Sequence, residues 1–335
     1  MARGQNFDGK EVFIVGGSGG LGKEMAKVMA SQGANITIFS RSQSNLDEAK
    51  AEILAARKND KTQKVDAIAA DMGDASTAQE ALTSLLPARL PDTLILVAGG
   101  TPDDLGFLAD NLGPQNFENC MKNNYYSSVY PSQTVLKQWI ADDASASSSS
   151  GDTKKPKTRK LVFVNSSASL IPTPGYLPYS AAKAAQRALA DTLRLEVMRY
   201  NNPKSRYVVQ CVFAHNFITP TFIREQKSKP ALTKRIEGTA GAENEDAEEM
   251  RARFPLASKI APEMVAGIAE GRDDFAVMDG RLEPQILWAG MVGSSPKRGW
   301  GVWDWFVGVM MHLVLYPSIR KGIEKECEGD AFREE

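Results

Sequence analysis

Short apolar runs alternate with segments of helical periodicity along the first two thirds of the chain. The apolar runs are rich in β-branched residues and predict buried strands. We predict strands at residues 11–15, 34–41, 64–72, 92–100, 160–167 and 207–214. Apolar residues that recur every three or four positions predict helices at residues 21–33, 44–59, 77–86, about 115–140 and 178–200. This order predicts an α/β fold, a doubly wound parallel sheet with helices on both faces.

Two stretches interrupt the alternation. Residues 141–160, ADDASASSSSGDTKKPKTRK, have no apolar period, and we expect a flexible surface loop there. Residues 220–260 follow the sixth predicted strand and include the long charged stretch 227–255, which predicts a lid-like helical segment. We therefore expect a single domain over residues 1–285, with this loop and this lid as its irregular parts.

Residues 286–335 differ from the rest of the chain. They hold an apolar, tryptophan-rich segment, WGVWDWFVGVMMHLVLYP at 300–317, and a charged tail. The apolar segment is interrupted by Asp304 and His312 and is shorter than the roughly 20 apolar residues of a membrane-spanning helix. We expect its aromatic rings to rest on a membrane surface. Packing across a subunit interface or along an apolar pocket is the alternative.

Charge and cysteine content restrict the classes of function. Among 335 residues, 40 Lys and Arg stand against 41 Asp and Glu, so no overall positive field favours nucleic acid as a partner. Three widely separated cysteines argue against a disulfide framework and, with two histidines at unfamiliar spacing, against a metal site. The amino terminus has no apolar core of signal-peptide length. We expect a protein of a reducing compartment that binds no metal.

A glycine-rich turn, VGGSGGLG at 15–22, lies between the first predicted strand and the first predicted helix. Glycines in this context let the backbone turn tightly and let a pyrophosphate approach the helix amino terminus. The turn therefore predicts a dinucleotide site in a Rossmann-like fold, although a purely structural turn is the alternative. The cofactor-binding candidates in this turn are Gly16, Ser18, Gly20, Leu21 and Gly22.

The end of the second predicted strand indicates which dinucleotide binds. Ser40 and Arg41 stand where an NAD site would carry an acid for the ribose diol. Because an arginine binds a phosphate through paired, charge-assisted hydrogen bonds, we predict NADPH rather than NADH. The alternative is that Ser40, Ser42 or Ser44 caps the next helix while Arg41 is solvated.

Polar and small residues follow the later strands, at the edge where open α/β sheets bind ligands. Asp71 ends the third predicted strand and is a candidate partner for an adenine amino group. Ala98 and Gly99 end the fourth without side chains that obstruct a cofactor, and Ser166 ends the fifth. Asn124 lies inside a predicted helix, where asparagine is a poor helix former and therefore indicates another role.

The segment YSAAK places a tyrosine and a lysine four residues apart. On a helix, residues four apart share a face, so the Tyr179 hydroxyl and the Lys183 ammonium can contact the same bound molecule. By itself such a pair is more often a half-buried ring beside a solvated cation. The pair gains meaning from the motifs that precede it.

Together, and in this order, these motifs resemble the short-chain dehydrogenase/reductase family. The resemblance covers about residues 9–225 and includes the glycine turn, Asp71, VAGG, Asn124, Ser166, YSAAK and ITPTF. The chain departs from the family pattern at Val15, Val97 and Ala214-His215, where threonine, asparagine and proline-glycine are usual. We expect these departures to alter hydrogen bonds around the cofactor without removing a catalytic group.

The resemblance implies a proton donor for a ketone reduction. Tyr179 would give its proton to the alkoxide that forms when hydride leaves the nicotinamide for a carbonyl carbon. Lys183, together with the positive charge of the oxidised nicotinamide, would lower the pKa of Tyr179 from its ordinary value. Lys183 would also bind the hydroxyls of the nicotinamide ribose.

The same resemblance implies roles for five further residues. Ser166 would donate a hydrogen bond to the substrate carbonyl, with Ser167 as the rival for this role because the two are adjacent. Asn124 would anchor a water that passes protons from the lysine to solvent. Thr219, together with Asn216, would hold the carboxamide of the cofactor.

Three segments are similar to the subgroup that reduces 3-ketodihydrosphingosine to dihydrosphingosine with NADPH in sphingolipid synthesis: NYYSSVYPSQ, VFAHNFITPTF and GYLPYSAAKAA. This likeness implies a long-chain lipid ketone as substrate, a homodimer or homotetramer, peripheral membrane contact and a place on the cytoplasmic face of the endoplasmic reticulum. Two alternatives stand beside it. One is a reductase of a steroid, a retinal or a 3-ketoacyl compound, and the other is a non-catalytic NADPH-binding scaffold.

Overall fold

The computed structural model describes residues 7–279 except 87, 102–104, 146–155, 171–172, 240–246 and 270–275, together with Arg281 and a few isolated positions between 309 and 321. The centre of the predicted surface loop and almost all of the tryptophan-rich segment therefore lie outside the described residues. The fold that follows is that of the described part of the chain.

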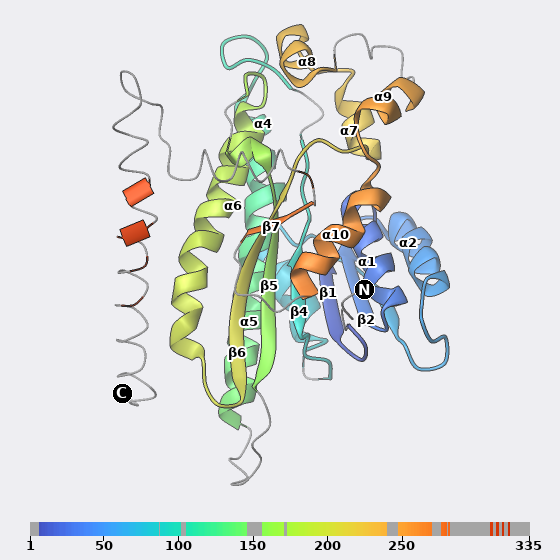
Figure 1. Cartoon of the computed structure of the whole chain (residues 1–335), viewed down its shortest axis with the longest axis vertical. Coiled ribbons are helices and arrows are strands. Elements are labelled where there is room, and N and C mark those ends of the chain that lie inside the picture. Colours follow the sequence, from blue (N-terminus) through green and yellow to red (C-terminus); the bar gives the residue numbers. More distant parts are fainter. Residues whose placement is uncertain are drawn as a thin grey trace.

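A seven-stranded sheet forms the centre of the fold, in the order β3-β2-β1-β4-β5-β6-β7 (Figure 1). All neighbouring strands pair in parallel. The strands are β1 (Glu11–Val15), β2 (Asn35–Ser40), β3 (Val65–Ala69), β4 (Thr93–Leu96), β5 (Lys157–Ser166), β6 (Ser205–Ala214) and β7 (Ala276–Met278). The predicted parallel α/β sheet is thus confirmed, and β7 adds a short edge strand that the sequence pattern did not indicate.

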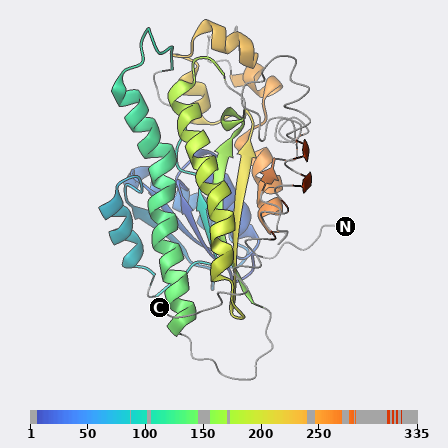
Figure 2. The same cartoon turned by 90° about the vertical axis from the view of Figure 1, so that its left-hand side faces the viewer.

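Helices cover both faces of the sheet (Figures 1 and 2). Their bounds are α1 (Gly20–Ser31), α2 (Gln43–Ala55), α3 (Ala75–Thr83), α4 (Pro114–Met121), α5 (Ser127–Ser145), α6 (Leu177–Glu196), α7 (Pro220–Glu225), α8 (Ala231–Glu237), α9 (Ala247–Arg253) and α10 (Ala257–Ala269). Helices α1, α2 and α10 pack on one face, and α3, α5 and α6 pack on the other. The doubly wound arrangement follows from this division.

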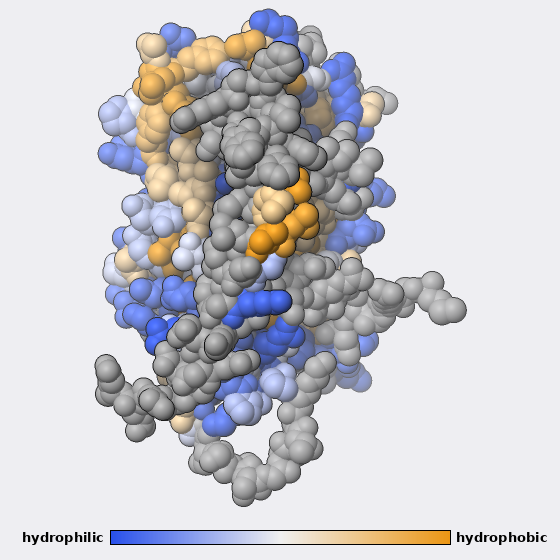
Figure 3. Space-filling model, turned by 60° about the vertical axis from the view of Figure 1, so that its left-hand side comes forward, coloured by the Kyte–Doolittle hydropathy of each residue, from blue (hydrophilic) through white to orange (hydrophobic). Residues whose placement is uncertain are grey.

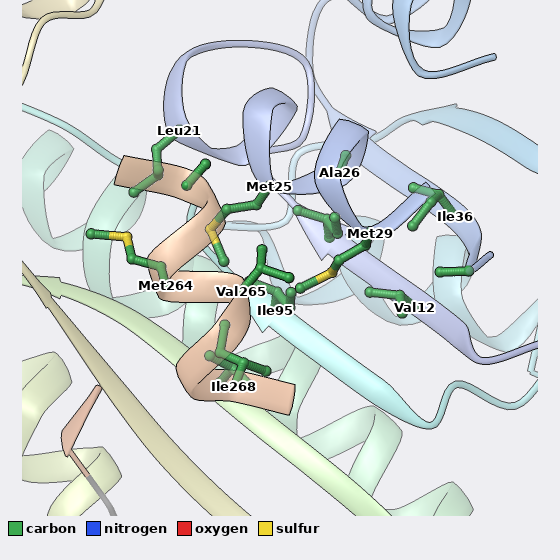
Figure 4. Packing of buried hydrophobic residues seen from close by; sticks show 14 of the residues in the cluster. Val12, Leu21, Met25, Ala26, Met29, Ile36, Ile95, Met264, Val265 and Ile268 are labelled. Atoms are coloured by element: carbon green, nitrogen blue, oxygen red, sulfur yellow. The ribbon is translucent and has the colours of Figure 1, made fainter. Parts of the chain in front are cut away.

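Apolar side chains that point alternately to the two faces of the sheet form two apolar cores, one on each face. Val12 and Ile14 of β1 belong to one buried cluster, whereas Phe13 and Val15 belong to the other, because successive side chains of a strand point to opposite faces. Figure 4 shows the first cluster, where α1 and α10 pack together over β1 and β4. Each fully buried aliphatic side chain contributes about 1.5–3 kcal/mol of transfer free energy.

The order of the strands leaves a crevice for a ligand at one edge of the sheet. The chain leaves β1 toward β2 and β3, then returns to place β4 on the other side of β1. At such a switch point the loops after neighbouring strands diverge and leave a crevice at their carboxyl ends. Helices α7 and α8 lie at this end of the sheet (Figure 1), where the sequence predicted a lid-like segment.

Some predicted boundaries were wrong, for identifiable reasons. Helix α5 continues to Ser145 and β5 begins at Lys157, so both ends of the predicted 141–160 loop are ordered elements. The ordering comes from Asp142 and Asp143, which contact Arg159 of β5. The predicted helix 115–140 is interrupted by a π-helical turn, η1 (Lys122–Tyr126).

Candidate active site at the carboxyl edge of the sheet

The glycine turn after β1 is shaped by contacts that exclude side chains. Gly16 has a φ of +89°, and a Cβ there would lie 2.5 Å from the backbone nitrogen of Ala98. A Cβ on Gly22 would collide with the carbonyl oxygen of Gly16. Helix α1 begins at Gly20, and its N-cap, Gly19, makes no side-chain capping bond. The first N–H groups of this 12-residue helix are thus left for an anion, which fits a dinucleotide pyrophosphate.

Residues at the end of β2 lie beside this turn. The Ser18 hydroxyl donates to the Ser40 hydroxyl over 2.8 Å. Arg41 is exposed and donates from Nη1 to Oδ1 of Asn123 over 3.2 Å. Ser42 caps α2 by accepting a backbone N–H of its first turn, as the alternative interpretation predicted for one of the serines. Because the cap uses neither Ser40 nor Arg41, both fit the place of a 2′-phosphate.

Asp71 lies two residues beyond β3 rather than at its end. Its Oδ2 is 3.0 Å from Nζ of Lys122, and its Oδ1 accepts the N–H of Gly73 over 3.0 Å. The carboxylate is therefore already paired on both oxygens. Its predicted bond to an adenine amino group stays a prediction, and that bond would share the carboxylate with the lysine.

Asn124 lies in the π-helical turn η1 and is fully buried. Its Nδ2 donates to the carbonyl oxygens of Cys120 and Gly100, each over 3.1 Å, and its Oδ1 accepts the N–H of Gly100 over 2.9 Å. Gly99 has a φ of +127°, and a Cβ there would collide with the asparagine Oδ1. The side chain thus ties the end of β4 to this helix. Its role in anchoring a water stays a prediction.

The catalytic tyrosine candidate lies near the start of α6. Tyr179 is partly exposed, and Ser166 at the end of β5 lies close enough to lower the pKa of its phenol. Ser167 instead has its Oγ 3.0 Å from Nδ1 of His215. These positions favour Ser166 over Ser167 as the partner of a carbonyl that binds beside Tyr179.

Lys183 is buried one helical turn after Tyr179, and its Nζ lies 5.9 Å from the centre of the tyrosine ring. The ammonium donates to the carbonyl oxygen of Val164 over 3.0 Å and to Oε1 of Gln186 over 3.4 Å. Asn165 donates to the same glutamine oxygen over 3.0 Å and to the lysine carbonyl over 2.9 Å. Asn165 and Gln186 were not among the residues predicted from the sequence. The available signal was the glutamine's position three residues after the lysine, on the same helix face.

The electrostatics of the protein alone oppose the predicted lowering of the tyrosine pKa. Burial raises the pKa of Tyr179, the nearby Ser166 lowers it, and the carboxylates of Glu225 and Glu237 raise it further. Burial also lowers the pKa of Lys183 to about 8. The net effect of the protein's own groups on the pKa of Tyr179 is upward, and the predicted lowering, which includes the charge of the oxidised nicotinamide, stays a prediction. A lowered pKa therefore depends on positive charge that a ligand brings to the site.

The segment after β6 reaches the glycine turn. Thr219 caps α7 by accepting the N–H of Phe222 over 3.0 Å, and its Cγ2 lies 3.4 Å from where a Cβ on Gly20 would stand. Arg281 donates to the carbonyl oxygen of Asn216 over 3.0 Å and holds the start of this segment. Thr219 thus lies beside the predicted cofactor turn, as its predicted role requires, and that role stays a prediction.

A charged cluster that was not predicted from the sequence lies next to Tyr179. We call it the carboxyl-end cluster, and it consists of Tyr176, Glu225, Lys229 and Glu237. The single proton of the Tyr176 hydroxyl is shared between Glu225, over 2.9 Å, and Glu237, over 3.0 Å, and the Tyr176 ring lies 6.1 Å from that of Tyr179. Lys229 is buried and pairs with both carboxylates, over 2.8 and 2.6 Å. The E-x-x-x-K spacing of Glu225 and Lys229 was the one local signal.

Comparison with known proteins agrees with this geometry. The family model described as short chain dehydrogenase matches residues 10–228. The chain therefore belongs to the short-chain dehydrogenase family and is an oxidoreductase of that family. This match spans the glycine turn, Tyr179 and Lys183.

Relatives that match over most of both chains carry a more specific name. The chain is 30% identical over 321 residues to a 3-ketodihydrosphingosine reductase of Neurospora crassa, covering 93% of this chain and 80% of that protein. It is 31% identical over 331 residues to a 3-ketodihydrosphingosine reductase of Aspergillus fumigatus, covering 94% of this chain and 83% of that protein. Among solved structures, L-sorbose reductase of Gluconobacter frateurii with NADPH and L-sorbose is 17% identical, with a TM-score of 0.64 over 82% of this chain and 97% of its own. The last likeness concerns the fold alone.

Proposed function

We propose that this chain reduces the 3-keto group of 3-ketodihydrosphingosine to a hydroxyl with NADPH, giving dihydrosphingosine. The observation that carries the proposal is the convergence of Tyr179, Ser166 and Lys183 at the carboxyl edge of the sheet. The names of the two fungal relatives, which match nearly the whole chain, supply the substrate.

The geometry supports a proton transfer with distinct roles for three side chains. When bound, the cofactor supplies the hydride for the carbonyl carbon. Ser166 and Tyr179, which lie next to each other, are placed to donate to the carbonyl oxygen as it becomes an alkoxide. Lys183 is held by the Val164 carbonyl and Gln186, so its charge stays one turn from the phenol and stabilises the phenolate.

The choice of NADPH rests on the end of β2. The exposed guanidinium of Arg41 and the hydroxyls of Ser18 and Ser40 lie beside the glycine turn. A guanidinium and two hydroxyls suit a 2′-phosphate, whereas a site for a free ribose diol would carry a carboxylate there.

An apolar rim supports a long-chain substrate. Figure 3 shows apolar residues gathered at the upper end of the face drawn there, the end at which α8 lies in Figure 1. Leu177, Leu232 and Ile236 are exposed on α6 and α8, and Thr233 of α8 donates to the carbonyl of Pro174, in the segment before α6, over 2.7 Å. Leu108 is exposed in the loop where Gly106 bridges to Tyr176. An alkyl chain or a bilayer surface would cover such a rim.

We further propose peripheral contact with the cytoplasmic face of the endoplasmic reticulum membrane and assembly as a homodimer or homotetramer. The apolar rim and a substrate whose alkyl chain partitions into lipid support the first point. Among the described residues, no helix combines the length and the apolar character that crossing a bilayer requires. The family resemblance supports the second point.

A ketone panel tests the proposed function. The purified chain is assayed for NADPH oxidation with 3-ketodihydrosphingosine, a steroid ketone, a retinal and a 3-ketoacyl thioester at equal concentrations. We expect 3-ketodihydrosphingosine to give the highest kcat/KM. A higher value for another ketone would assign the chain to a different substrate class, and no turnover of any would support a non-catalytic role.

A further inference from the structure

The carboxyl-end cluster holds an unbalanced charge. Two carboxylates, Glu225 and Glu237, share the single ammonium of Lys229, so the three contacting side chains carry one net negative charge. The lysine side chain is fully buried and Glu225 is only 6% exposed. Among the described residues, no second cation contacts the two carboxylates, and a buried net charge is costly, so the arrangement needs a reason.

Glu225 contacts residues on two sides of the proposed reaction site, Thr101 after β4 and Tyr176 before α6. Its Oε2 accepts a hydrogen bond from Thr101, which follows Gly100, the residue after β4 that Asn124 holds. Its Oε1 accepts from Tyr176, whose ring packs against that of Tyr179. Thr101 and Tyr179 are both partly exposed, so the carboxylate lies just behind the surface that a bound ketone would touch.

We propose that Glu225 is the specificity-determining residue that binds the substrate's ammonium group. The inference rests on the proposed function, because 3-ketodihydrosphingosine carries an amine on the carbon next to the ketone. With the ketone between Ser166 and Tyr179, that amine lies one carbon away from the reacting centre. Glu225 then pairs with the ammonium while Lys229 stays paired with Glu237 over 2.6 Å, so the buried charges balance.

The same arrangement rejects neutral ketones. A steroid, a retinal or an N-acylated analogue brings no cation, so it leaves the net negative charge buried behind it. The hydrogen bonds from Thr101 and Tyr176 fix the carboxylate, so Glu225 does not have to reorganise to meet the amine. Selection by charge thus acts next to the atom that reacts.

The test compares two ketones, one with a charged amine at this position and one with a neutral acetamide. Wild type, Glu225→Gln and Glu225→Asp are assayed with NADPH on 3-ketodihydrosphingosine and on its N-acetyl derivative, and the ratio of the two kcat/KM values is measured. Glu263→Gln, on the exposed side of α10, is the matched control. We expect wild type to favour the amine, and Glu225→Gln to lower the ratio by roughly 10- to 100-fold, the usual range for a hydrogen bond to a charged group.

The ratio separates binding of the amine from a general effect. Removing the Glu225 charge also changes the pKa of Tyr179, but that change acts on both substrates and cancels in the ratio. Glu225→Asp should retain more of the ratio than the glutamine variant, and Glu263→Gln should retain all of it. The aspartate variant and the wild-type ratio remain decisive if the glutamine variant does not fold.

Two outcomes overturn the inference while leaving the proposed function standing. One is a wild type that reduces the amine and its N-acetyl derivative equally well. The other is a Glu225→Gln variant that loses activity on both to the same extent. A wild type that reduces neither sphingoid ketone but reduces another member of the ketone panel would instead refute the proposed function.

Discussion

Two charged clusters lie at opposite ends of the sheet. Comparing them distinguishes buried charges that stabilise the fold from buried charges that we propose bind a ligand. The carboxyl-end cluster lies beside Tyr179. The amino-end cluster lies where β5 and β6 begin and consists of Arg159, Asp142, Asp143, Ser205 and Tyr207. Each cluster pairs one cation with two carboxylates.

The difference between the clusters is access to water. Asp142 is 49% exposed, so solvent screens the extra negative charge of the amino-end cluster. Burial by itself would raise the pKa of Asp143, but hydrogen bonds from Tyr207, Asn202 and Ser205 lower it below its ordinary value. The amino-end cluster is thus satisfied by the protein and by water. At the carboxyl end, Glu237 is only 12% exposed, so solvent screens the net charge of that cluster much less.

The largest expected effect is at the carboxyl end. Tyr179→Phe should lower kcat/KM for 3-ketodihydrosphingosine by about 10³-fold or more, because the alkoxide loses its proton donor. NADPH affinity and the melting temperature should change little. Steady-state NADPH oxidation, a cofactor-binding titration and a thermal melt check the three points. Retained turnover would refute the assigned role.

The matching change at the amino end should act on stability. Arg159→Met leaves Asp143 buried without its cation and should lower the free energy of unfolding by about 3–5 kcal/mol. The kcat/KM per folded molecule should stay unchanged. Asp142→Asn, at the half-exposed partner, is the control and should cost about 1 kcal/mol or less. Urea titration measures the difference, and a loss of activity in the folded variant would contradict the comparison.

A third change tests an exposed charge at the same edge as the active site. Arg41→Glu should raise the Kd of NADPH by roughly 10- to 100-fold, since a charge-assisted pair with the 2′-phosphate is replaced by repulsion. The Kd of NADH should change far less. Fluorescence titration with both cofactors measures the preference, and an unchanged ratio would place recognition of the 2′-phosphate elsewhere.

The smallest expected effect is a pH dependence of stability. It arises because the charged, buried side chain of Lys183 lowers the free energy of unfolding. Burial lowers its pKa in the folded state to about 8, below the value near 10.5 in the unfolded chain. Between these values the unfolded chain binds the extra proton, so stability rises with pH there. Between pH 8 and pH 10, the free energy of unfolding of the wild type should therefore rise by about 1–2 kcal/mol relative to that of Lys183→Met. Denaturant titrations at both pH values check the sign, and a gain in the variant instead would contradict it.

Local patterns in the sequence were enough for most of the fold. The glycine turn after β1 and the Tyr179–Lys183 pair were predicted because their meaning lies within a few neighbouring residues. The order of strands and helices followed from alternating apolar periods, and the parallel sheet was confirmed. The ends of α5 and β5 were wrong because a salt bridge between Asp142 and Arg159 orders residues that look like a loop.

By itself, then, the sequence determined the parallel α/β sheet, the family and the candidate proton donor, because each depends on the spacing of residues that are close together in the chain. Only the tertiary structure favoured Ser166 over Ser167, because the decision lies in which serine meets Tyr179 and which meets His215. Only the tertiary structure brought Tyr176 to Glu225 and Glu237, 49 and 61 residues away. The physical reason is that electrostatic energies depend on distance and burial in space, and separation along the chain specifies neither.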